Sequence, residues 1–599
     1  MIPPDTVFAS AADAARFAAV PPAARLPARD LPGLFVHAAR RRPEAPAIRY
    51  LPRGLLGDAP EDWTFGRLHA AMLRVAANLA AAGVGPGDTV AALLPNGPET
   101  LAVVLGAQAA SVIAPINVYL EAREIATLLD AMAARVLVAD GEVVEGKLDA
   151  ILAACASPPR LLRRAELLAA GSSAGFALRD RSAEQVALFH TGGTTGLPKL
   201  VPLTGENFAV CALFSSYGYG YTDTDRVFAA MPMFHVGGLL ASALFPLANG
   251  ASLVIAGESG YRGPGTVADT WALAERERVT VLIAPPTVMG QLAQNAPGKA
   301  RIPALRLLVN GAAALPVSIG NALVERLQVP LTEPWGLTEA CLAVTSMPLH
   351  GQRRAGSVGV ALPYCGVKAV RVDAQGREAG DCGVDEIGVL AISGPSVFSG
   401  YRGVEAGRQP FFRGGWLDTG DLGRVDADGY VWITGRAKDL IKRGGHGIDP
   451  AVIEAALYAH PAVALAAAVG RPDAYAGELP IAYVQLKPGH LALPTELLDL
   501  AARSIAERAA VPKDIIVLDA LPLTGVGKVD KTLLRLDAAH RTFEALLREL
   551  VGSGQRVALE IAPHPRHGTF VQVRVPAAHV EGARRLLAQF PHQHEVLAF

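Results

Sequence analysis

The sequence has few of the residues that mark disulfide-linked or zinc-binding proteins. Only five of its 599 residues are cysteines, they are scattered, and no two of them form a Cys-x-x-Cys pair. No histidine stands at metal-ligand spacing from them, which argues against a structural zinc site. We therefore expect buried, reduced thiols. The cysteines are Cys155, Cys211, Cys341, Cys365 and Cys382.

Long apolar runs and a secretory signal are also missing. The N-terminus contains acidic residues and has no uninterrupted apolar core behind a basic stretch. The most apolar window, residues 101–120, contains Gln108, Pro115 and Asn117 and falls short of the roughly 20 apolar residues that a membrane-spanning helix needs. We expect a cytoplasmic protein in which this window forms a buried helix followed by a strand.

Neither sign of charge dominates. Lysine and arginine number 55, and aspartate and glutamate number 56, so no strong field would draw the protein to nucleic acid or to an anionic membrane. A small molecule or a protein is therefore the expected partner.

Length and patterning predict several domains of α/β type. Between residues 63 and 284, helix-like stretches alternate with short apolar runs, which predicts parallel sheets covered by helices. Dense turn signals after residue 357 predict a β-rich subdomain. A helix, an alternating strand and a further helix before Lys528 predict a small α+β domain. Alternating apolar residues beyond residue 541 predict an extra α+β module.

We expect three parts, residues 1–436, 437–537 and 538–599. The first is a large body of mixed and parallel sheets with helices, the second a small mobile domain behind a hinge, and the third the added module, whose role the sequence does not assign. That module contains His564, His567, His592 and His594. No cysteines accompany these histidines and they lack helical spacing, so surface histidines are preferred over a metal site.

The strongest local pattern follows the strand-like run QVALFH. Its glycines permit a tight loop whose backbone NH groups converge on an anion, and its threonines and lysine add donors and positive charge. It is not a P-loop, because Leu197 and Pro198 separate the last glycine from Lys199 and no hydroxyl residue follows. A polyphosphate is the expected ligand, with a plain Gly/Thr-rich turn as the alternative. The motif comprises Thr191, Gly192, Gly193, Thr194, Thr195, Gly196, Leu197, Pro198 and Lys199.

A second pattern joins an aromatic ring, a glycine, a hydroxyl and a carboxylate within five residues: Trp335, Gly336, Leu337, Thr338 and Glu339. The ring is able to stack on a nucleobase, and the carboxylate is able to hold Mg²⁺. Taken alone, a surface turn is at least as good an interpretation.

Three weaker patterns follow. Residues 415–421 end in Asp421, a carboxylate able to accept hydrogen bonds from ribose hydroxyls or, equally, an aspartate in a β-turn. Residues 435–446 are basic and glycine-rich, as in a phosphate-binding segment or a solvated connector. Residues 522–528 present Lys528 on a flexible loop, where a lysine is usually ordinary surface.

Taken together and in this order, the five stretches resemble the adenylate-forming enzymes, the family of acyl-CoA synthetases, the adenylation domains of peptide synthetases and firefly luciferase. The resemblance covers roughly residues 30–535 and includes residues 231–238 and the GELP run that starts at Gly477. It implies an ATP-dependent acid–thiol ligase. Such an enzyme activates a carboxylic acid as an acyl-adenylate, releases pyrophosphate, and passes the acyl group to the thiol of coenzyme A.

The resemblance also implies roles for individual residues. Thr191–Lys199 would surround the phosphates, with Thr338 and Glu339 beside the α-phosphate and Glu339 holding Mg²⁺. Asp421 would bind the ribose, and Arg436 would reach the nucleotide. Adenine would lie against Trp335, Gly336, Gly311, Ala312 and Ala313.

Further roles belong to the moving domain and the acid pocket. Lys438 occupies the hinge position, Lys528 matches the lysine that serves adenylation, and Lys442 and Gly445 match the face used for thioester formation. His235 is interpreted as a gate beside the acyl pocket, with an ordinary half-buried histidine as the alternative.

Some positions depart from the family pattern. Gly192 stands where many relatives have serine, Trp335 where most have tyrosine, and an alanine run replaces the usual small-residue and proline pattern after Gly311. Relatives that activate amino acids usually offer an aspartate to the substrate ammonium, and residues 232–238 contain none. An acid with an uncharged tail is therefore favoured.

Several functions compete at this point. The match at Lys442 and Gly445 favours coenzyme A over a carrier-protein thiol as the acceptor. Lys528, Glu339 and Asp421 argue against a non-catalytic nucleotide-binding relative, and nothing calls for a luciferase-like oxygenase. Fatty, aryl and alicyclic acids all remain open, as does a homodimer.

Overall fold

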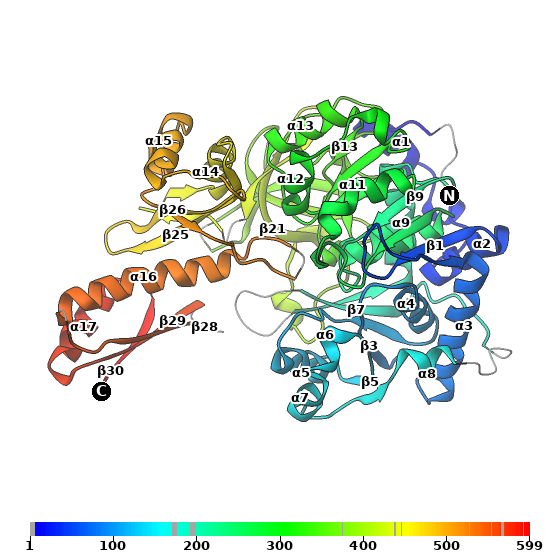
Figure 1. Ribbon diagram of the computed structural model, residues 1–599, viewed down its shortest axis with the longest axis horizontal. Helices are drawn as coiled ribbons and strands as arrows, with labels where there is room; N and C mark the ends of the chain where they lie inside the picture. Colours follow the sequence, from blue (N-terminus) through cyan, green and yellow to red (C-terminus); the bar gives the residue numbers. More distant parts are fainter. Residues whose placement is uncertain are drawn as a thin grey trace. The chain divides into compact units, whose positions relative to one another are not determined.

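The computed structural model of the chain describes residues 6–169, 176–191, 199–373, 375–436, 439–444, 446–525, 527–552, 554–564, 568–590 and 592–599. These residues form two compact units (Figure 1). The first comprises the described residues up to Thr191, together with Lys199–Thr419 and Gly423–Ile433. The second comprises Gly420–Leu422 and the described residues of Thr434–Phe599.

A six-stranded sheet in the first unit has the order β6-β5-β3-β4-β7-β8. All neighbours are parallel except β7 and β8, which form an antiparallel pair. Helices cover this sheet, and its central strands β3 and β4 are therefore buried along their whole length rather than alternating. The strands are β3 (Thr89–Leu93), β4 (Val112–Pro115), β5 (Ala134–Ala139), β6 (Arg160–Leu162), β7 (Gln185–Thr191) and β8 (Lys199–Thr204). The helices of this region are α3 (Phe65–Ala81), α4 (Pro98–Ala110), α5 (Ala122–Ala131), α6 (Glu142–Glu145), α7 (Leu148–Ala154) and α8 (Arg164–Leu168).

The apolar window at residues 101–120 folds as expected. It forms the buried helix α4 followed by strand β4, since every α4 residue except Glu99 is buried. Among the described residues, no helix is both long enough and apolar enough to cross a membrane.

A seven-stranded sheet in the same unit has the order β13-β12-β11-β9-β10-β1-β2. It is parallel from β13 to β1, and β2 is antiparallel to β1. The strands are β1 (Pro46–Leu51), β2 (Glu61–Thr64), β9 (Arg226–Ala229), β10 (Ser252–Ala256), β11 (Val281–Ala284), β12 (Leu307–Asn310) and β13 (Leu331–Thr332). The accompanying helices are α1 (Ala11–Ala18), α2 (Leu31–Arg41), α9 (Gly205–Tyr219), η2 (Gly237–Leu244), α10 (Phe245–Ala248), α11 (Thr266–Arg276), α12 (Pro286–Gln294) and α13 (Val317–Leu327).

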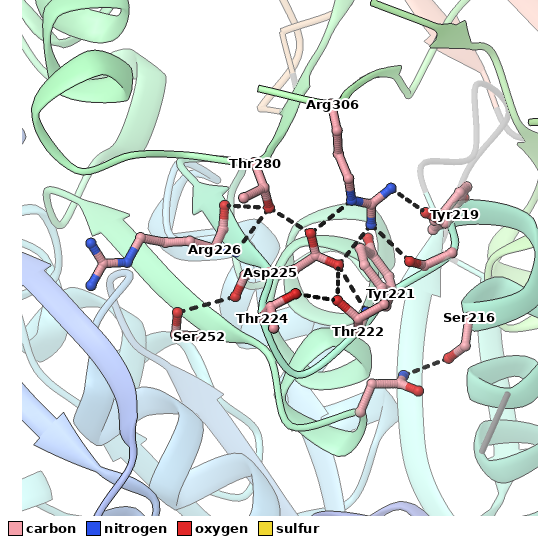
Figure 2. Close-up of polar contacts among 12 residues, drawn as sticks. Ser216, Tyr219, Tyr221, Thr222, Thr224, Asp225, Arg226, Ser252, Thr280 and Arg306 are labelled. Carbon is pink, nitrogen blue, oxygen red and sulfur yellow. Dashed lines mark hydrogen bonds and ion pairs between the residues drawn. The ribbon is translucent and has the colours of Figure 1, made fainter. Parts of the chain in front are cut away.

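A polar network ties together the amino ends of three of these parallel strands (Figure 2). Asp225 precedes β9, Thr280 precedes β11 and Arg306 precedes β12. Asp225 accepts two hydrogen bonds of 2.7 Å from Arg306 and one of 2.6 Å from the Thr280 hydroxyl. Arg306 also donates to the carbonyl oxygens of Tyr219 and Gly220, at the end of α9. The network therefore fixes the distance between the seven-stranded sheet and the end of α9.

The Asp225 carboxylate is almost completely enclosed, with a side-chain exposure of 2%. Burial raises its pKa, but the Arg306 guanidinium and the Thr280 hydroxyl lower the pKa by more, so it lies below its usual range. The stability that this ionised carboxylate contributes is therefore present above its unfolded pKa of about 3.9 and is lost as the pH falls below that value.

Replacing Arg306 by leucine tests the network. The change leaves the buried Asp225 carboxylate without its partner, so we expect the free energy of unfolding to fall by about 3 kcal/mol. Urea unfolding followed by tryptophan fluorescence measures this loss, because all five tryptophans belong to the first unit. The control is Arg371→Leu, which breaks an exposed pair with Glu386 and should cost less than about 1 kcal/mol. Equal losses in the two variants would contradict the role assigned to the network.

The β-rich part expected after residue 357 consists mainly of one antiparallel sheet. Its order is β18-β17-β19-β21-β20, with β22 paired to β21, and a smaller sheet β14-β15-β16 precedes it. The smaller sheet comprises β14 (Trp335–Gly336), β15 (Ala343–Ser346) and β16 (Val360–Ala361). The larger comprises β17 (Gly366–Val372), β18 (Glu378–Asp381), β19 (Gly388–Ser393), β20 (Phe411–Phe412), β21 (Trp416–Val425) and β22 (Val431–Arg436).

The second unit contains two further sheets. A five-stranded sheet has the order β24-β23-β26-β25, with β27 paired to β26, and a three-stranded sheet has the order β28-β29-β30. The strands of the first are β23 (Ile441–Arg443), β24 (His446–Ile448), β25 (Val463–Asp473), β26 (Gly477–Leu486) and β27 (Ile515–Leu518). Those of the second are β28 (Ala558–His564), β29 (Gly568–Val575) and β30 (Gln593–Ala598). The helices are α14 (Pro450–Tyr458), α15 (Pro494–Ser504), α16 (Lys531–Val551) and α17 (Val580–Leu587).

The last residues form the small α+β module that the alternating pattern predicted. Val571, Val573 and Val575 of β29 point into a core shared with Phe543 and Leu547 of α16. Within the described residues, no group of three or more histidine, cysteine, aspartate or glutamate side chains could hold a metal ion. The mixed α/β architecture expected from the sequence is confirmed.

Two sequence expectations need correction. His592 is half-buried rather than freely exposed: its ring packs edge-on against Phe543, with 5.4 Å between the ring centres, and burial lowers its pKa. The thiols are all free, but only Cys211 and Cys341 are fully buried by surface area. The other three cysteines are partly exposed.

Candidate active site

The two ends of the predicted phosphate loop are held by the β7–β8 hairpin. Thr191, the last residue of β7, lies directly opposite Lys199, the first residue of β8. The antiparallel register therefore brings the threonine and the lysine side by side, as a loop closing on an anion requires. The remaining residues of that expected site lie outside the described residues: Gly192, Gly193, Thr194, Thr195 and Gly196.

The second motif folds into a tight, buried turn. Trp335 and Gly336 form the short strand β14, and Thr338 and Glu339 start the 3₁₀ turn η5 (Thr338–Ala340). A Cβ atom on Gly336 would lie 1.9 Å from the carbonyl oxygen of Leu342, so only glycine fits there. Trp335, Thr338 and Glu339 have exposures of 7%, 8% and 7%. The carboxylate is therefore an interior group rather than part of a surface turn.

Tyr401 connects this turn to the hairpin and was missed by the sequence analysis. Its hydroxyl donates a 2.6 Å hydrogen bond to Oε1 of Glu339, and the Nζ atom of Lys199 lies 4.7 Å from the centre of its ring. A lone tyrosine in a turn-rich stretch has no spacing that distinguishes it. The structure thus brings Lys199 and Glu339, which are far apart in the sequence, to one side chain.

The predicted adenine turn leaves the carboxyl end of β12. The amide of Gly311 donates to the carbonyl of Ala284, and the Asn310 side chain donates to the carbonyl of Ala313 at 2.8 Å. Ala312 has a φ of +75°, a left-handed conformation that costs a residue with a Cβ about 1–2 kcal/mol. Such strain is common where a backbone is shaped for a ligand.

His235 lies on a loop that the side chain of Asn96 holds in place. The Asn96 amide donates to the carbonyl of Met231 at 3.0 Å and accepts from the backbone NH of Met233 at 2.8 Å. The backbone NH of Gly237 donates to Nδ1 of His235 at 3.1 Å. With Nδ1 as acceptor, the neutral ring carries its proton on Nε2. Asn96 is a second residue that the sequence analysis missed.

In the second unit, Asp421 and Arg436, the two residues predicted to bind the nucleotide, form an ion pair with each other. Nε of Arg436 lies 2.9 Å from Oδ1 of Asp421, whose side chain is 8% exposed. Lys442 lies on β23, with its side chain exposed and its backbone NH donating to Glu478. Lys528 lies in a turn where its backbone carbonyl accepts from the NH of Thr524. The other two predicted residues lie outside the described residues: Lys438 and Gly445.

The donors at Glu339 suit magnesium. Mg²⁺ is usually held by one or two carboxylates together with waters and substrate phosphates, rather than by a cage of protein ligands. A single buried carboxylate beside the Thr338 hydroxyl fits that pattern. The roles of these residues stay predictions.

His190 directly precedes the phosphate loop, and its Nε2 accepts from the backbone NH of Asn117 at 3.3 Å. Burial lowers the pKa of His190 to about 4. Because the unfolded pKa is about 6.5, stability is fully present above that pH and is lost as the pH falls through about 4.

The pH dependence of stability therefore has an identifiable source at this histidine. We expect the free energy of unfolding to fall more steeply between about pH 6 and about pH 4.5 in the unaltered chain than in a His190→Asn variant. The excess slope should reach up to about 1.4 kcal/mol per pH unit. Urea unfolding at both pH values, followed by tryptophan fluorescence, provides the comparison. Parallel slopes would contradict a neutral buried His190.

Comparisons with known proteins find matches over much of the chain. A sequence model for AMP-binding enzymes matches residues 35–402, and one for the C-terminal domain of these enzymes matches residues 452–528. The marinolic acid–CoA ligase of Pseudoalteromonas sp. (strain SANK 73390) is 34% identical over 552 residues, covering 88% of this chain and 84% of that protein.

Two solved structures share the fold. The ATP-bound MatB of Rhodopseudomonas palustris has a TM-score of 0.74 at 27% identity, covering 86% of this chain and 99% of that chain. The o-succinylbenzoate CoA synthetase of Bacillus subtilis, solved in complex with its acyl-adenylate intermediate, has a TM-score of 0.71 at 29% identity, with coverages of 84% and 97%.

Proposed function

The chain belongs to the family of AMP-binding enzymes and is an ATP-dependent acyl-CoA ligase; we propose that the acid it activates is uncharged apart from its carboxylate, and that Mg²⁺ assists at Glu339. The observation that carries the proposal is the meeting of Lys199, Tyr401 and Glu339 beside the β7–β8 hairpin. A cation and a carboxylate fixed at the mouth of a Gly/Thr-rich loop suit a metal-bound polyphosphate.

The first half-reaction needs positioning rather than a covalent nucleophile. The substrate carboxylate attacks the α-phosphorus of ATP, and the bond to the bridging oxygen breaks to release pyrophosphate. Thr191 and Lys199 are proposed to hold the phosphates, and Thr338 to lie beside the α-phosphate. Magnesium, when bound, supplies charge stabilisation to the phosphate oxygens. Lys528 is proposed to serve this step from the second unit.

The nucleoside has its own proposed contacts. The left-handed turn at Ala312 and the ring of Trp335 are proposed to bind adenine. Asp421 is proposed to bind the ribose hydroxyls, and Arg436 to reach the nucleotide. Asp421 already pairs with the Arg436 guanidinium, and carboxylate oxygens have capacity for further hydrogen bonds.

The thioester step is proposed to use a different surface of the second unit. We place a hinge at Lys438, with parts at residues 1–436, 437–537 and 538–599. Rotation about the hinge would replace Lys528 by the face that carries Lys442 and Gly445. The thiol of coenzyme A then attacks the acyl carbon, and AMP leaves.

The acid is proposed to lie beside the loop of residues 231–238. That loop offers no aspartate to a substrate ammonium, and His235 is proposed to act as a gate beside the acid. The tight loop geometry supports this role, since a Cβ on Gly238 would lie 2.0 Å from the carbonyl of Pro232. Relatives that act on different acids leave the choice among fatty, aryl and alicyclic acids to experiment.

A pair of lysine variants tests the proposal. We expect Lys528→Ala to lower acid-dependent pyrophosphate release by at least about 100-fold, because one positively charged donor is lost from the transition state. Lys442→Ala should keep adenylate formation within about twofold while slowing thioester formation about tenfold. Pyrophosphate release from Mg-ATP is measured across fatty, aryl and alicyclic acids, with and without coenzyme A. The comparison gives the effect of each variant on adenylate formation and on thioester formation.

The unaltered chain sets the reference. Acid-dependent release that coenzyme A accelerates supports the ligase, whereas release with no response to coenzyme A favours a carrier-protein thiol. Equal losses of rate in both steps for both variants would contradict the assignment of Lys528 to adenylate formation and of Lys442 to thioester formation.

A further inference from the structure

Tyr401 contacts two groups of opposite charge with two different parts of its side chain. The hydroxyl donates to the Glu339 carboxylate at 2.6 Å, and the ring face lies 4.7 Å from the Lys199 ammonium. Within the described part of the chain, Lys199 and Glu339 form no ion pair with each other. The tyrosine is therefore the group that both charges share.

We propose that Tyr401 is a positioning residue that holds Lys199 and Glu339 apart, so that the lysine faces the phosphates and the carboxylate faces the metal. This inference rests on the proposed function, because it gives the two charges a metal-bound nucleotide to face. Opposite charges a few ångströms apart in a protein attract strongly. Without Tyr401 between them, Lys199 and Glu339 would pair with each other and would no longer face the nucleotide and its metal.

Tyrosine is suited to this task by its charge distribution. The ring face is negative and attracts an ammonium, while the hydroxyl is a donor that a carboxylate accepts. One rigid side chain therefore binds a cation and an anion at different places. The hydrogen bond engages one oxygen of Glu339, Oε1, and so helps to orient the carboxylate.

The backbone of Tyr401 is itself clamped by Gln409. The Gln409 amide accepts from the NH of Tyr401 at 2.7 Å and donates to its carbonyl at 3.0 Å. Gly400 has a φ of +133°, and a Cβ there would lie 2.8 Å from the Gln409 amide carbon. Glycine at this position thus allows the glutamine to reach the tyrosine.

Two backbone hydrogen bonds attach this segment to both sides of the site. The NH of Phe398 donates to the carbonyl of Glu339 at 2.8 Å, and the NH of Arg402 donates to the carbonyl of Leu200 at 3.0 Å. The segment from Phe398 to Arg402 therefore bridges η5 and β8, and its one tyrosine has little freedom to move away.

The test is nucleotide binding at equilibrium, with and without metal. A Tyr401→Phe variant keeps the ring and loses only the hydroxyl. Using α,β-methylene-ATP and calorimetry, we expect the dissociation constant with Mg²⁺ to rise about tenfold, the effect of losing one hydrogen bond to a charged group. With EDTA in place of Mg²⁺, the constant should change by less than about twofold, because the lysine contact remains.

Two further variants separate positioning from folding. Tyr401→Leu also removes the ring, so metal-free binding should weaken as well, by about threefold. In a Glu339→Gln background, Tyr401→Phe should have no further effect on metal-dependent binding, because the two residues act as one unit. The matched control is Tyr430→Phe, which removes a hydroxyl bonded to the carbonyl of Gln352 and should leave both dissociation constants unchanged.

A structural role alone would weaken nucleotide binding equally with and without Mg²⁺, and that result would overturn the proposal. An unchanged dissociation constant in Tyr401→Phe would overturn it too, as would a full effect of that substitution in the Glu339→Gln background. Failure of the ligase assignment is seen separately, as absence of pyrophosphate release by the unaltered chain with every acid. Absence of any nucleotide binding by that chain would contradict both.

Discussion

The Glu339 carboxylate lies inside the protein, at 7% exposure, and the proposed function requires it also to be available to a ligand. An ionised carboxylate in such a place is costly unless donors surround it. The 2.6 Å hydrogen bond from Tyr401 supplies one donor, and the bridge of residues 398–402 keeps that donor in place. The clamp by Gln409 and the backbone bonds to η5 and β8 hold the tyrosine that makes this contact.

The seven-stranded sheet separates stability from the candidate chemistry. Asp225, Thr280 and Arg306 form their network at the amino ends of β9, β11 and β12. The loop that bears His235 and the strained turn at Ala312 leave the opposite, carboxyl ends. Ligands of open α/β sheets bind at the carboxyl ends of the strands. The network at the other end keeps the strands in register without taking part in binding.

Most of the fold could be predicted because its signals are local. The apolar run that became α4 and β4 and the alternating valines of β29 are each read from a few adjacent residues. The candidate site could be predicted in part, since Thr338, Glu339 and Asp421 stand in compact motifs. Their burial was not evident from those motifs, because a carboxylate in a turn usually faces water.

The missed residues are those whose partners are far away in the sequence. Tyr401 bonds to a residue 62 positions away, and Asn96 to one 135 positions away. A single tyrosine or asparagine has no period or spacing that signals such a contact, and only the folded chain brings the partners together. The same holds for His592, whose burial against Phe543 depends on packing across the last module.

The central claim is a two-step reaction through an acyl-adenylate, and trapping that intermediate tests it most directly. The protein, Mg-ATP and an acid are mixed without coenzyme A, quenched and analysed by mass spectrometry, and a second sample receives coenzyme A before the quench. The account predicts acyl-AMP bound to the protein in the first sample, and acyl-CoA with AMP in the second. Acyl-CoA formed with ADP and phosphate, and no adenylate in either sample, would contradict it.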